Sequence, residues 1–535
     1  MHAHPQAADD EQPRLISALR EGRCYPHAVK NVRLLETHIS WVLLAGRYAY
    51  KIKKPVNLGF LDFSTLAARQ FFCAEEIRLN RRLAPQLYLD VIAIGGTPDA
   101  PVMGAEPALE YAVRMRRFAV SRQLDRLLLR GALLPQHLDN LAVTIARFHH
   151  SLPAADRAST YGSPAAIGTA AMENFAHLLD LLGDPADQQA VGALQEASKS
   201  EFAACDRLFA QRREQGHVRE CHGDLHLGNI VLLGGEAVPF DGIEFNPALR
   251  WIDVISEIAF TVMDLQQHQR HDLASRFLNA WLQESGDYSA VAVLRFYIAY
   301  RAAVRAKVCA IRAAQEQQGK RARSQALAAC RGYLALAAQS LWREPPVLII
   351  THGLPGSGKT TFSQAALERL GAIRIRSDVE RKRLHGLSPL AASAGAEVYG
   401  ADATRRTYAR LLELAGVLLK AGYTVIVDAA FLKQDERRQF SQLAQELAVP
   451  FAIASLQAGD NTLKSRISQR MQAGNDASEA GLDVLQLLQE KQELLSQQER
   501  QRTVVFLNEE TGLIEGTSLA ESAWAALERL LQAGT

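Results

Sequence analysis

The sequence has few cysteines and no long apolar run, and both absences narrow the class of protein. No two cysteines form a CxxC pair or another spacing typical of metal ligands. The six are Cys24, Cys73, Cys205, Cys221, Cys309 and Cys330. No apolar stretch approaches the ~18 residues of a membrane-spanning helix, and the first residues lack the basic and then apolar pattern of a secretory signal. We therefore expect a cytoplasmic protein with reduced thiols and no membrane contact.

The chain also lacks a marked excess of charge, fixed-period repeats and low-complexity tracts. Its net charge is +2 over 535 residues, so the overall composition does not indicate nucleic acid or a membrane surface as a partner. The content of 48% hydrophobic and 22% charged residues is typical of globular proteins. Because 535 residues are too many for one hydrophobic core, we expect two or three compact domains.

One domain boundary stands out. Pro345 and Pro346 directly precede the apolar run VLIITHG, and proline pairs tend to end helices and separate domains. We place the boundary near residue 344, which gives an N-terminal domain over 1–344 and a C-terminal domain over 345–535. The first is divided into an N-lobe of about residues 15–118 and a helical C-lobe of about 119–344. Downstream, four strand-like segments alternate with helices, which predicts an α/β domain with a parallel sheet.

The segment CHGDLHLGNIVLLGGEAVPFDGIEFN, residues 221–246, carries side chains suited to phosphoryl transfer. Transfer to an alcohol needs a carboxylate near the acceptor hydroxyl and oxygen ligands for Mg²⁺. Asp224 lies five residues before Asn229, the spacing of the protein-kinase catalytic loop, and Asp241 follows twelve residues after Asn229. We predict Asp224 as the catalytic base and Asn229 and Asp241 as metal ligands, with His222 and His226 holding the loop.

A kinase-like ATP site also needs a strand lysine and a helix glutamate that orients it. The segment YAYKIKK offers Lys51 and Lys53, and CAEEIRLN offers Glu75 and Glu76. Strand alternation places both lysines on one face, so periodicity does not choose between them. The match of AYK to the kinase V-A-I-K pattern favours Lys51, and we choose Glu76 over Glu75.

The motif H-G-D-x-H-x-x-N followed by an aspartate resembles that of the aminoglycoside phosphotransferase family, which is akin to protein kinases. The resemblance implies a protein-kinase-like α+β fold that uses ATP and Mg²⁺. A polycationic acceptor would need an acidic pocket, yet residues 295–331 contain nine Lys or Arg against one acid, Glu316. Arg301 and Arg305 share a helix face by their spacing. We predict that they contact an anionic or neutral acceptor; a solvated basic face is the alternative.

A second nucleotide motif follows the boundary. The segment GLPGSGKT matches G-x-x-x-x-G-K-[ST] between an apolar strand and a helix. Backbone amides of such a loop surround phosphate oxygens, its lysine bridges the β- and γ-phosphates, and its Ser or Thr hydroxyl binds Mg²⁺. The predicted nucleotide contacts are Gly353, Gly356, Ser357, Gly358, Lys359, Thr360 and Thr361, with Thr360 also a metal ligand.

The next strand ends at Asp378, nineteen residues after Lys359, and Arg381 follows it. This D-x-x-R is similar to that of small P-loop kinases such as polynucleotide 5′-hydroxyl kinases, chloramphenicol phosphotransferases, gluconate kinases and zeta-type toxins. The resemblance implies that Asp378 is the base at the acceptor hydroxyl and that Arg381 contacts the substrate. The alternative for Asp378 is a helix-capping role.

Three further residues complete the predicted C-terminal site. Asp428 ends the strand TVIVDAA and is predicted to lie near the metal. Arg466 and Arg470 fall on one helix face by their spacing, as arginines that close over a phosphate would need. Ordinary surface arginines are the alternative for this pair.

From about Leu15 to residue 530 the chain resembles bacterial two-domain proteins described as bifunctional aminoglycoside phosphotransferase and ATP-binding protein. The segments YKIKKPVNLGFLDFSTLAARQ, HGDLHLGNIVL, GLPGSGKTT and RSDVERKR carry this resemblance. It supports the domain order and identifies neither acceptor. We expect a phosphotransferase with two ATP sites that acts on hydroxyl groups of small metabolites. The alternatives are a regulatory nucleotide-binding protein with one active domain, and a C-terminal domain that phosphorylates nucleic acid 5′ ends.

Overall fold

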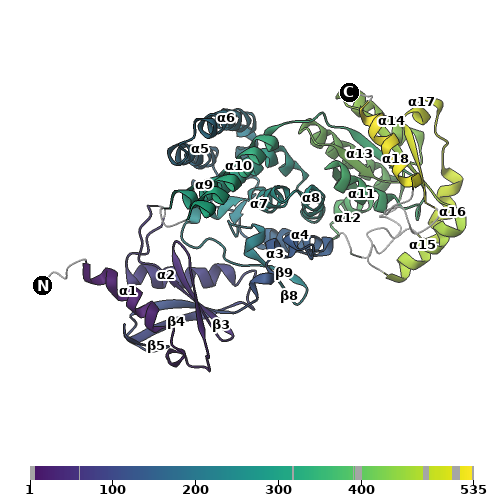
Figure 1. The fold of residues 1–535 in the computed structure, drawn as a ribbon. Coiled ribbons are helices and arrows are strands. Elements are labelled where there is room, and N and C mark those ends of the chain that lie inside the picture. The colour runs from purple at the N-terminus through teal and green to yellow at the C-terminus, as the bar shows by residue number, and fades with distance from the viewer. Residues whose placement is uncertain are drawn as a thin grey trace. The chain divides into compact units, whose positions relative to one another are not determined.

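The structure, a computed structural model, describes residues 6–59, 61–315, 319–388, 391, 400–473, 481–508 and 518–532. Packing divides the chain into two compact units, and their elements are labelled in Figure 1. The first unit comprises Met1–Leu141, Phe148–Ala170 and Phe209–Asp264, and the second comprises Ala142–Arg147, Ala171–Leu208 and Leu265–Thr535. The predicted boundary near residue 344 lies inside the second unit, because the helices before it pack with the C-terminal sheet domain.

An antiparallel sheet with strand order β1-β2-β3-β6-β4-β5 forms the core of the first unit. Its strands are β1 (Val32–Glu36), β2 (Ser40–Ala45), β3 (Tyr48–Lys53), β4 (Tyr88–Thr97), β5 (Ala100–Met103) and β6 (Glu110–Arg116). The predicted hairpin over residues 38–55 corresponds to β2 and β3, in which Val42 pairs with Lys51. The alternation of side chains along β3 therefore decides what faces each side of the sheet.

Different elements cover the two faces of this sheet. One face packs against α2 (Leu66–Asn80) and the hairpin of β8 (Ile230–Leu233) and β9 (Glu236–Pro239), as the apolar cluster around Ala49 shows. The other face packs against α1 (Gln6–Ala18) through the cluster around Tyr50. Because Ala49 faces α2, the alternate residues Lys51 and Lys53 face α2 as well.

The remaining part of the first unit surrounds residues 221–246, the motif that the sequence predicts to be catalytic. A short antiparallel pair of β7 (Val218–Glu220) and β10 (Trp251–Asp253) flanks the motif. Most of α7 (Val254–Gln267) follows directly, and α4 (Pro135–Ser151) ends in this unit. These elements place the motif between a buried helix and the β8–β9 hairpin.

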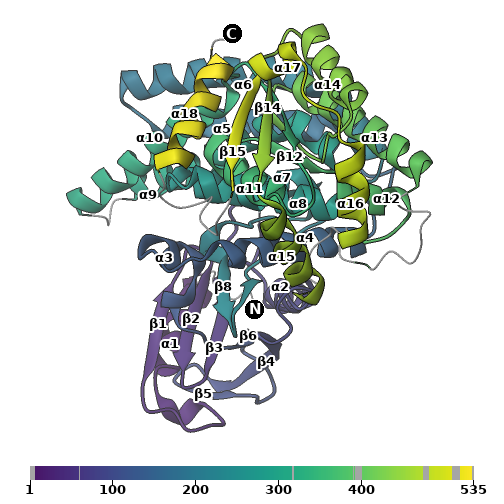
Figure 2. The same ribbon diagram turned by 90° about the vertical axis from the view of Figure 1, so that its right-hand side faces the viewer.

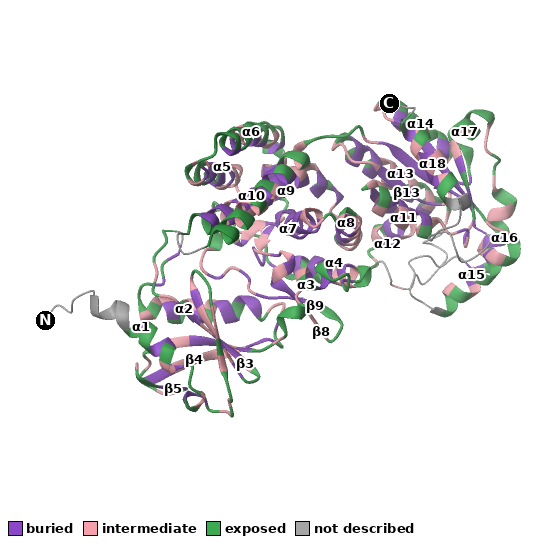
Figure 3. Ribbon diagram, in the orientation of Figure 1, coloured by how far each residue is buried: buried purple, intermediate pink, exposed green. Residues whose placement is uncertain are grey.

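The first part of the second unit is helical, in line with the predicted C-lobe. Its elements are most of α5 (Pro164–Leu181), most of α6 (Pro185–Glu214), α8 (His271–Ser285), α9 (Val291–Ala314) and α10 (Lys320–Leu341). Figure 3 shows exposed residues along α5, α6 and α10, whereas residues 272–284 of α8 and 291–310 of α9 are all buried or partly buried.

A parallel sheet with strand order β12-β13-β11-β14-β15 forms the rest of the second unit. Its strands are β11 (Leu348–His352), β12 (Ile373–Arg376), β13 (Val425–Asp428), β14 (Phe451–Gln457) and β15 (Thr503–Leu507). The first four match predicted strands, whereas the half-exposed β15 was not predicted. All residues of β11 and β13 are buried, as is typical of central parallel strands.

Helices cover both faces of the parallel sheet. An apolar cluster joins one face to α11 (Lys359–Leu370) and α18 (Ser518–Gln532), and Figure 2 shows α18 beside β15. The other face contacts α13 (Ala401–Lys420) and α14 (Gln434–Glu446). The predicted classes, α+β for the N-terminal part and α/β for the C-terminal part, are confirmed. In the described part of the chain, no helix has both the length and the apolar character needed to cross a bilayer.

His352 is a buried polar residue at the carboxyl end of β11. Its side chain shares a hydrogen bond with Ser455 Oγ on β14 at 3.0 Å. Burial, reinforced by the positive charges of Arg437 and Lys359, lowers the pKa of His352 to about 4. The folded protein therefore holds this ring neutral, whereas an exposed histidine in the unfolded chain titrates at its ordinary pKa near 6.5.

We expect His352 to make the second unit acid-sensitive. The pKa of His352 is lower in the folded state than in the unfolded chain. The stabilisation that the neutral ring gives to the folded state is therefore fully present above pH 6.5 and is lost as the pH falls toward 4. Between pH 7.5 and 5.5 this amounts to about 1 kcal/mol of unfolding free energy. Denaturant unfolding of the wild type and His352→Gln at both pH values should show that extra loss only in the wild type. Equal losses would contradict the assignment.

Candidate active sites

The catalytic motif of the first unit lies in the loop between β7 and β8. Asn229 is buried and donates from Nδ2 to Asp224 Oδ2 at 2.8 Å and to the Asp224 backbone oxygen at 3.1 Å. The Asp224 side chain remains 34% exposed. One side of this carboxylate is thus oriented by Asn229, and the structure brings these two predicted residues together.

A second cluster in the first unit joins β3, α2 and the end of β9. Lys51 Nζ donates to Glu76 Oε1 at 2.9 Å and to Asp241 Oδ1 at 2.6 Å. Asp241 follows β9 with a backbone φ of 63°, and its amide donates to Tyr88 Oη at 2.9 Å. Its side chain is 45% exposed. The structure therefore gathers three of the residues predicted for ATP and metal binding.

The sequence offered two candidate lysines, Lys51 and Lys53, and two candidate glutamates, Glu75 and Glu76, and these have different surroundings. Lys53 is fully buried, where it bonds Glu76 Oε2 at 2.8 Å and also pairs with Glu244. Glu75 instead pairs with Arg78 at 2.8 Å. Of the two lysines, Lys51 is thus the one that contacts the partly exposed Asp241. Of the two glutamates, Glu76 is the one that contacts Lys51.

Electrostatics keeps this cluster ionised. Burial by itself would lower the pKa of Lys51, but Asp241 and Glu76 raise it well above its ordinary value. Burial would raise the pKa of Glu76, but Lys51 and Lys53 lower it. A buried ammonium group that stays charged can exchange a carboxylate partner for an anionic ligand without losing a proton.

Side chains of helix α7 form hydrogen bonds with backbone groups of the catalytic loop. The sequence analysis did not predict this arrangement. Glu257 Oε1 accepts from the amides of His222 at 2.6 Å and Gly223 at 2.8 Å. Thr261 donates to the Leu225 oxygen at 2.6 Å. Asp264 then accepts from the Leu227 amide at 2.9 Å. These three α7 residues are spaced four and three apart, so one helix face holds successive backbone groups around Asp224.

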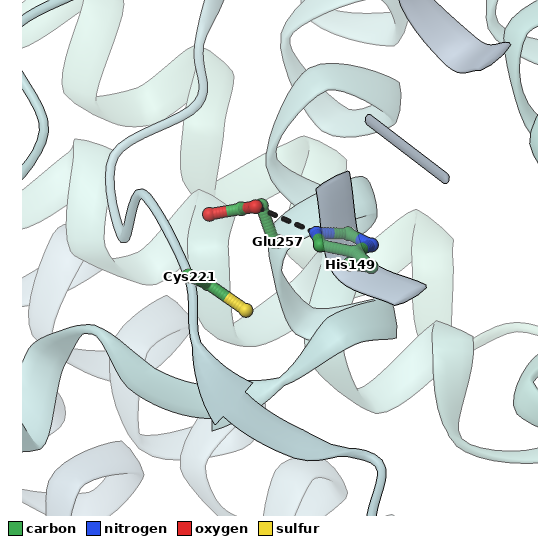
Figure 4. Close-up of side chains that lie close together, drawn as sticks. All are labelled: His149, Cys221 and Glu257. Atoms are coloured by element: carbon green, nitrogen blue, oxygen red, sulfur yellow. Dashed lines mark hydrogen bonds and ion pairs between the residues drawn. The ribbon is translucent and has the colours of Figure 1, made fainter. Parts of the chain in front are cut away.

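His149, Cys221 and Glu257 form a buried group whose possible ligand atoms lie within 4.8 Å of one another (Figure 4). Glu257 Oε2 accepts from His149 Nε2 at 2.7 Å, and Cys221 Sγ lies 3.7 Å from the Ile252 oxygen. Burial would raise the pKa of Glu257, but the hydrogen bond from His149 and the backbone amides lower it. Because hydrogen bonds already occupy both Glu257 oxygens, the group fits a loop anchor better than a metal site.

The two motif histidines also contact the loop. His222 Nε2 bonds the Phe240 oxygen at 2.9 Å, and the Asp224 amide donates to His222 Nδ1 at 3.3 Å. Burial lowers the pKa of His222, which keeps the ring neutral and fits these two roles. His226 Nδ1 accepts from the Gly228 amide at 3.1 Å. His222 thus ties the catalytic loop to the strand that precedes Asp241.

The phosphate loop of the second unit connects β11 to α11. Gly356 and Gly358 have φ values of 83° and 95°, a conformation that favours glycine. A Cβ at Gly356 would also lie 2.9 Å from the Leu463 oxygen. Lys359 begins α11 and donates to the Leu354 oxygen at 2.8 Å. The loop therefore has the backbone shape that presents amides to phosphate oxygens.

The other predicted loop residues occupy different positions. Gly353 has a φ of 148°, and a Cβ there would lie 2.4 Å from the Leu456 oxygen. Ser357 is buried, and its Oγ has no hydrogen-bond partner within the described ranges. Thr360 is partly exposed and Thr361 exposed in the first turn of α11. The loop region thus has one buried hydroxyl residue, Ser357, and two that are at least partly exposed, Thr360 and Thr361.

Asp428 ends β13 beside α11 and is 5% exposed. It accepts from Ser363 Oγ at 3.0 Å and lies 3.7 Å from Arg376 Nε. Ser363 is one turn beyond Thr360 on α11, so Asp428 adjoins the helix of the phosphate loop. The sequence analysis did not identify Ser363, although its spacing of three from Thr360 places both on one helix face.

Asp378 is the second residue of α12 (Ser377–Leu384), and its side chain is partly exposed. The N-cap of this helix is Arg376, which makes no side-chain capping bond. Among the described residues, the Asp378 carboxylate has no hydrogen bond or ion pair. Its charge still suits the first turn of a helix, and the carboxylate remains accessible to a ligand.

Arginines cluster around the carboxyl end of β12. Arg374 Nη1 lies 3.4 Å from Ser363 Oγ, and Arg381 is 8% exposed and donates to Thr404 Oγ1 at 3.2 Å. Burial, together with the nearby charge of Arg376, lowers the pKa of Arg374 to about 10. Arg374 and Arg376 were not predicted as site residues, although the two-residue period of RIRS places them on one face of the strand.

Arg466 lies on α15 (Asp460–Ala473) and contacts the phosphate loop. Its Nη1 is 3.4 Å from the Gly356 oxygen, and its Nη2 donates to Asn508 Oδ1 at 3.0 Å. Asn508 in turn donates to the Ser357 oxygen at 3.0 Å. Arg470 lies one turn further along the same helix. Asn508 is a loop contact that the sequence did not reveal.

The basic residues predicted near an acceptor lie on α9 and α10 of the second unit. Arg301 is 5% exposed with its guanidinium 5.4 Å from the Tyr300 ring, and Arg305 lies 5.7 Å from the Tyr333 ring. Arg331 pairs with Asp187 at 2.7 Å. Arg301, Arg305 and Arg331 thus have different surroundings, and Glu316 lies outside the described residues.

Glu257→Ala should destabilise the first unit and loosen the catalytic loop. Two buried amides and His149 would lose their acceptor, at a cost of about 3 kcal/mol of unfolding free energy. Hydrogen exchange at residues 222–225 should rise with it. Glu236→Ala, at the exposed first residue of β9, is the matched control and should leave both measurements near the wild type. A Glu257 variant as stable and as protected as the control would contradict the anchoring role.

Solved structures resemble each half of the chain. A choline/ethanolamine kinase family protein from Mesorhizobium loti is 12% identical, with 58% of this chain and 92% of that chain covered and a TM-score of 0.36. A gluconokinase from Sinorhizobium meliloti is 22% identical, with 36% and 97% covered and a TM-score of 0.25.

At the level of sequence, one comparison matches part of the C-terminal region and another matches most of the chain. A family model described as an AAA domain matches residues 348–495. The uncharacterized protein Rv2004c of Mycobacterium tuberculosis is 31% identical over 468 residues, which cover 86% of this chain and 91% of the relative. The chain therefore belongs to the same family as this mycobacterial protein.

Proposed function

We propose that the chain is a phosphotransferase with two ATP sites, each of which transfers the γ-phosphate to a hydroxyl group of a small anionic or neutral metabolite. The observation that carries the proposal is a duplicated set of groups. Lys51, Asp241 and Asp224 lie in the first unit, and Lys359, Asp428 and Asp378 lie in the second. Each set supplies a cation for phosphate, a carboxylate for metal and a carboxylate for the acceptor.

The residues present fit ATP with Mg²⁺ at both sites. In the first unit, Asn229 and the half-exposed Asp241 offer oxygen ligands of the kind that Mg²⁺ prefers. In the second, Thr360 and Asp428 do so, and the positive φ of Gly356 and Gly358 gives the turn that presents backbone amides to phosphate oxygens. When bound, Mg²⁺ supplies positive charge next to the phosphate oxygens.

In the first unit, the proposed base is Asp224. Its Oδ2 accepts from Asn229, so the carboxylate is oriented to take the proton of an acceptor hydroxyl. Lys51 holds phosphate oxygens and Glu76 positions Lys51. Lys53 is the poorer choice because its side chain is fully buried between Glu76 and Glu244.

In the second unit, the proposed base is Asp378, whose carboxylate is accessible and lies at the carboxyl edge of the sheet, where α/β proteins place ligands. Lys359 would leave the Leu354 oxygen for the phosphates. Arg376 and Arg381 flank the same strand end, which favours an acceptor that carries negative charge. Arg466 adjoins the phosphate loop and would counter charge on the transferred group.

The acceptor of the first site is proposed to be anionic or neutral and not an aminoglycoside. The excess of nine basic residues over one acid in residues 295–331 favours this class of acceptor, and Arg301 and Arg305 remain acceptor contacts predicted from the sequence alone. A pocket for a polycation would need acids instead.

Calorimetric titration with a nonhydrolysable ATP analogue and Mg²⁺ should detect two nucleotides per chain. Asp241→Ala and Lys359→Ala should each remove one binding event, because each takes away a metal or phosphate ligand at one site. Lys464→Ala, on the exposed face of α15, should retain both. A single event in the wild type would refute the two-site proposal and favour a chain with one degenerate domain.

Asp378→Asn should slow phosphoryl transfer by the second unit about 10² to 10⁴-fold with ATP affinity nearly intact, as expected for loss of a general base. The assay follows radiolabelled phosphate from ATP into a metabolite extract, in an Asp224→Asn background that silences the first site. Asp402→Asn, exposed on α13, is the control. An unchanged rate would remove Asp378 from the catalytic residues.

The acceptor class of the first site is tested separately, in the chain with Asp224 intact, where efficient transfer to kanamycin would contradict an anionic or neutral acceptor.

A further inference from the structure

We propose that α8 and α9, which precede the parallel-sheet domain in sequence, position the acceptor-side helix α12 of that domain, with Arg383 as the positioning residue. All of these elements belong to the second unit. This inference rests on the proposed function of the second site, because α12 carries Asp378. It adds that the helical segment is part of the acceptor-binding apparatus.

The first contact is made by Asn279 on α8. This residue is 4% exposed and donates to the Ala372 oxygen at 2.9 Å while accepting from the Arg374 amide at 2.7 Å. β12 is the edge strand of the parallel sheet, so this side chain takes the place of a neighbouring strand over those two residues. The strand that leads into α12 is therefore held from outside the sheet.

The second contact is made by α12 itself. Arg383 Nη2 donates to the Gln283 oxygen at 2.5 Å near the end of α8, and Nη1 pairs with the buried Glu380. α8 ends at Gly286, with a φ of 74°, where a Cβ would lie 2.7 Å from Arg383 Nε. The helix end is thus shaped to admit this arginine.

Two further arginines extend the attachment. Arg276 on α8 pairs with Glu368 on α11 at 2.8 Å. Arg295 on α9 donates to the Ala421 and Gly422 oxygens at 2.6 Å each, at the carboxyl end of α13. A cation at that end also complements the helix dipole.

These contacts reach only one side of the parallel-sheet domain in the described part of the chain. They end on α11, β12, α12 and α13, of which β12 leads directly into α12 and α13 packs against it, whereas α15 with Arg466 receives none of them. A helix that is bonded to a neighbouring helix keeps its carboxylate in one place, so loss of the bond should affect the acceptor more than the nucleotide.

Arg383→Ala in the full chain tests the proposal by hydrogen exchange. The amides of residues 377–384 should exchange at least tenfold faster than in the wild type, with the affinity for a fluorescent ATP analogue unchanged. Arg383→Lys keeps a donor for the Gln283 oxygen and should restore slow exchange. Arg410→Ala is the matched control, since Arg410 lies 3.7 Å from the same Glu380 but has no contact with α8 among the described residues.

The outcomes separate the positioning role from general stability. Faster exchange in Arg383→Ala alone, with rescue by lysine, supports the proposal. Equal exchange in Arg383→Ala and wild type, or equal acceleration in Arg383→Ala and Arg410→Ala, overturns it. Asn279→Ala should also speed exchange of the Arg374 amide. No change there would count against the proposal that α8 holds β12 and α12.

Turnover provides an independent reading. With an acceptor found in the extract screen, Arg383→Ala should raise the KM for acceptor about tenfold and leave the KM for ATP near the wild type. If the wild type transfers no phosphate through Asp378, the proposed function fails, and the exchange measurements still decide whether α8 positions α12.

Discussion

The geometry around Asp224 depends on one buried carboxylate, that of Glu257. A loop that must present an aspartate and an asparagine to ligands cannot satisfy its own amides in regular structure. Glu257 accepts two of these amides at once and is itself held by His149. Thr261 and Asp264 continue the same pattern along α7. The loop is therefore ordered by a rigid helix, which is how a flexible segment can hold reacting groups in place.

The two proposed sites bring similar groups together with different backbones. In the first, side chains from an antiparallel sheet, a helix and a hairpin converge, so Lys51 and Asp241 meet although 190 residues separate them. In the second, the phosphate loop is one continuous stretch of sequence, and its backbone amides are suited to bind phosphate oxygens. The first site therefore depends on tertiary packing, and the second on the local conformation of a few glycines.

This difference explains what could be predicted from the sequence. The phosphate loop, the catalytic spacing from Asp224 to Asn229 and four of the five parallel strands are local patterns, and they were visible. Asn279, Glu257 and Arg383 were not, because a polar residue on a helix reads as exposed until the packing is known. Periodicity could not choose between Lys51 and Lys53, since both share a face. The match of AYK to V-A-I-K favoured Lys51, and the structure separates the two by burial and by the contact of Lys51 with Asp241. The half-exposed β15 carried too weak an apolar pattern to be found.

The covered edge of β12 bears on how the chain can be divided. A proline pair marks residue 345 as the place where a domain should begin, and a fragment cut there would include every element of the phosphate loop. It would also strip Asn279 from the outermost strand and leave the carbonyls at the end of α13 without Arg295. An exposed parallel edge is a template for pairing with another chain. Such a fragment should self-associate. For the same reason, a gene rearrangement that transfers the sheet domain to another protein would need to include α8 and α9.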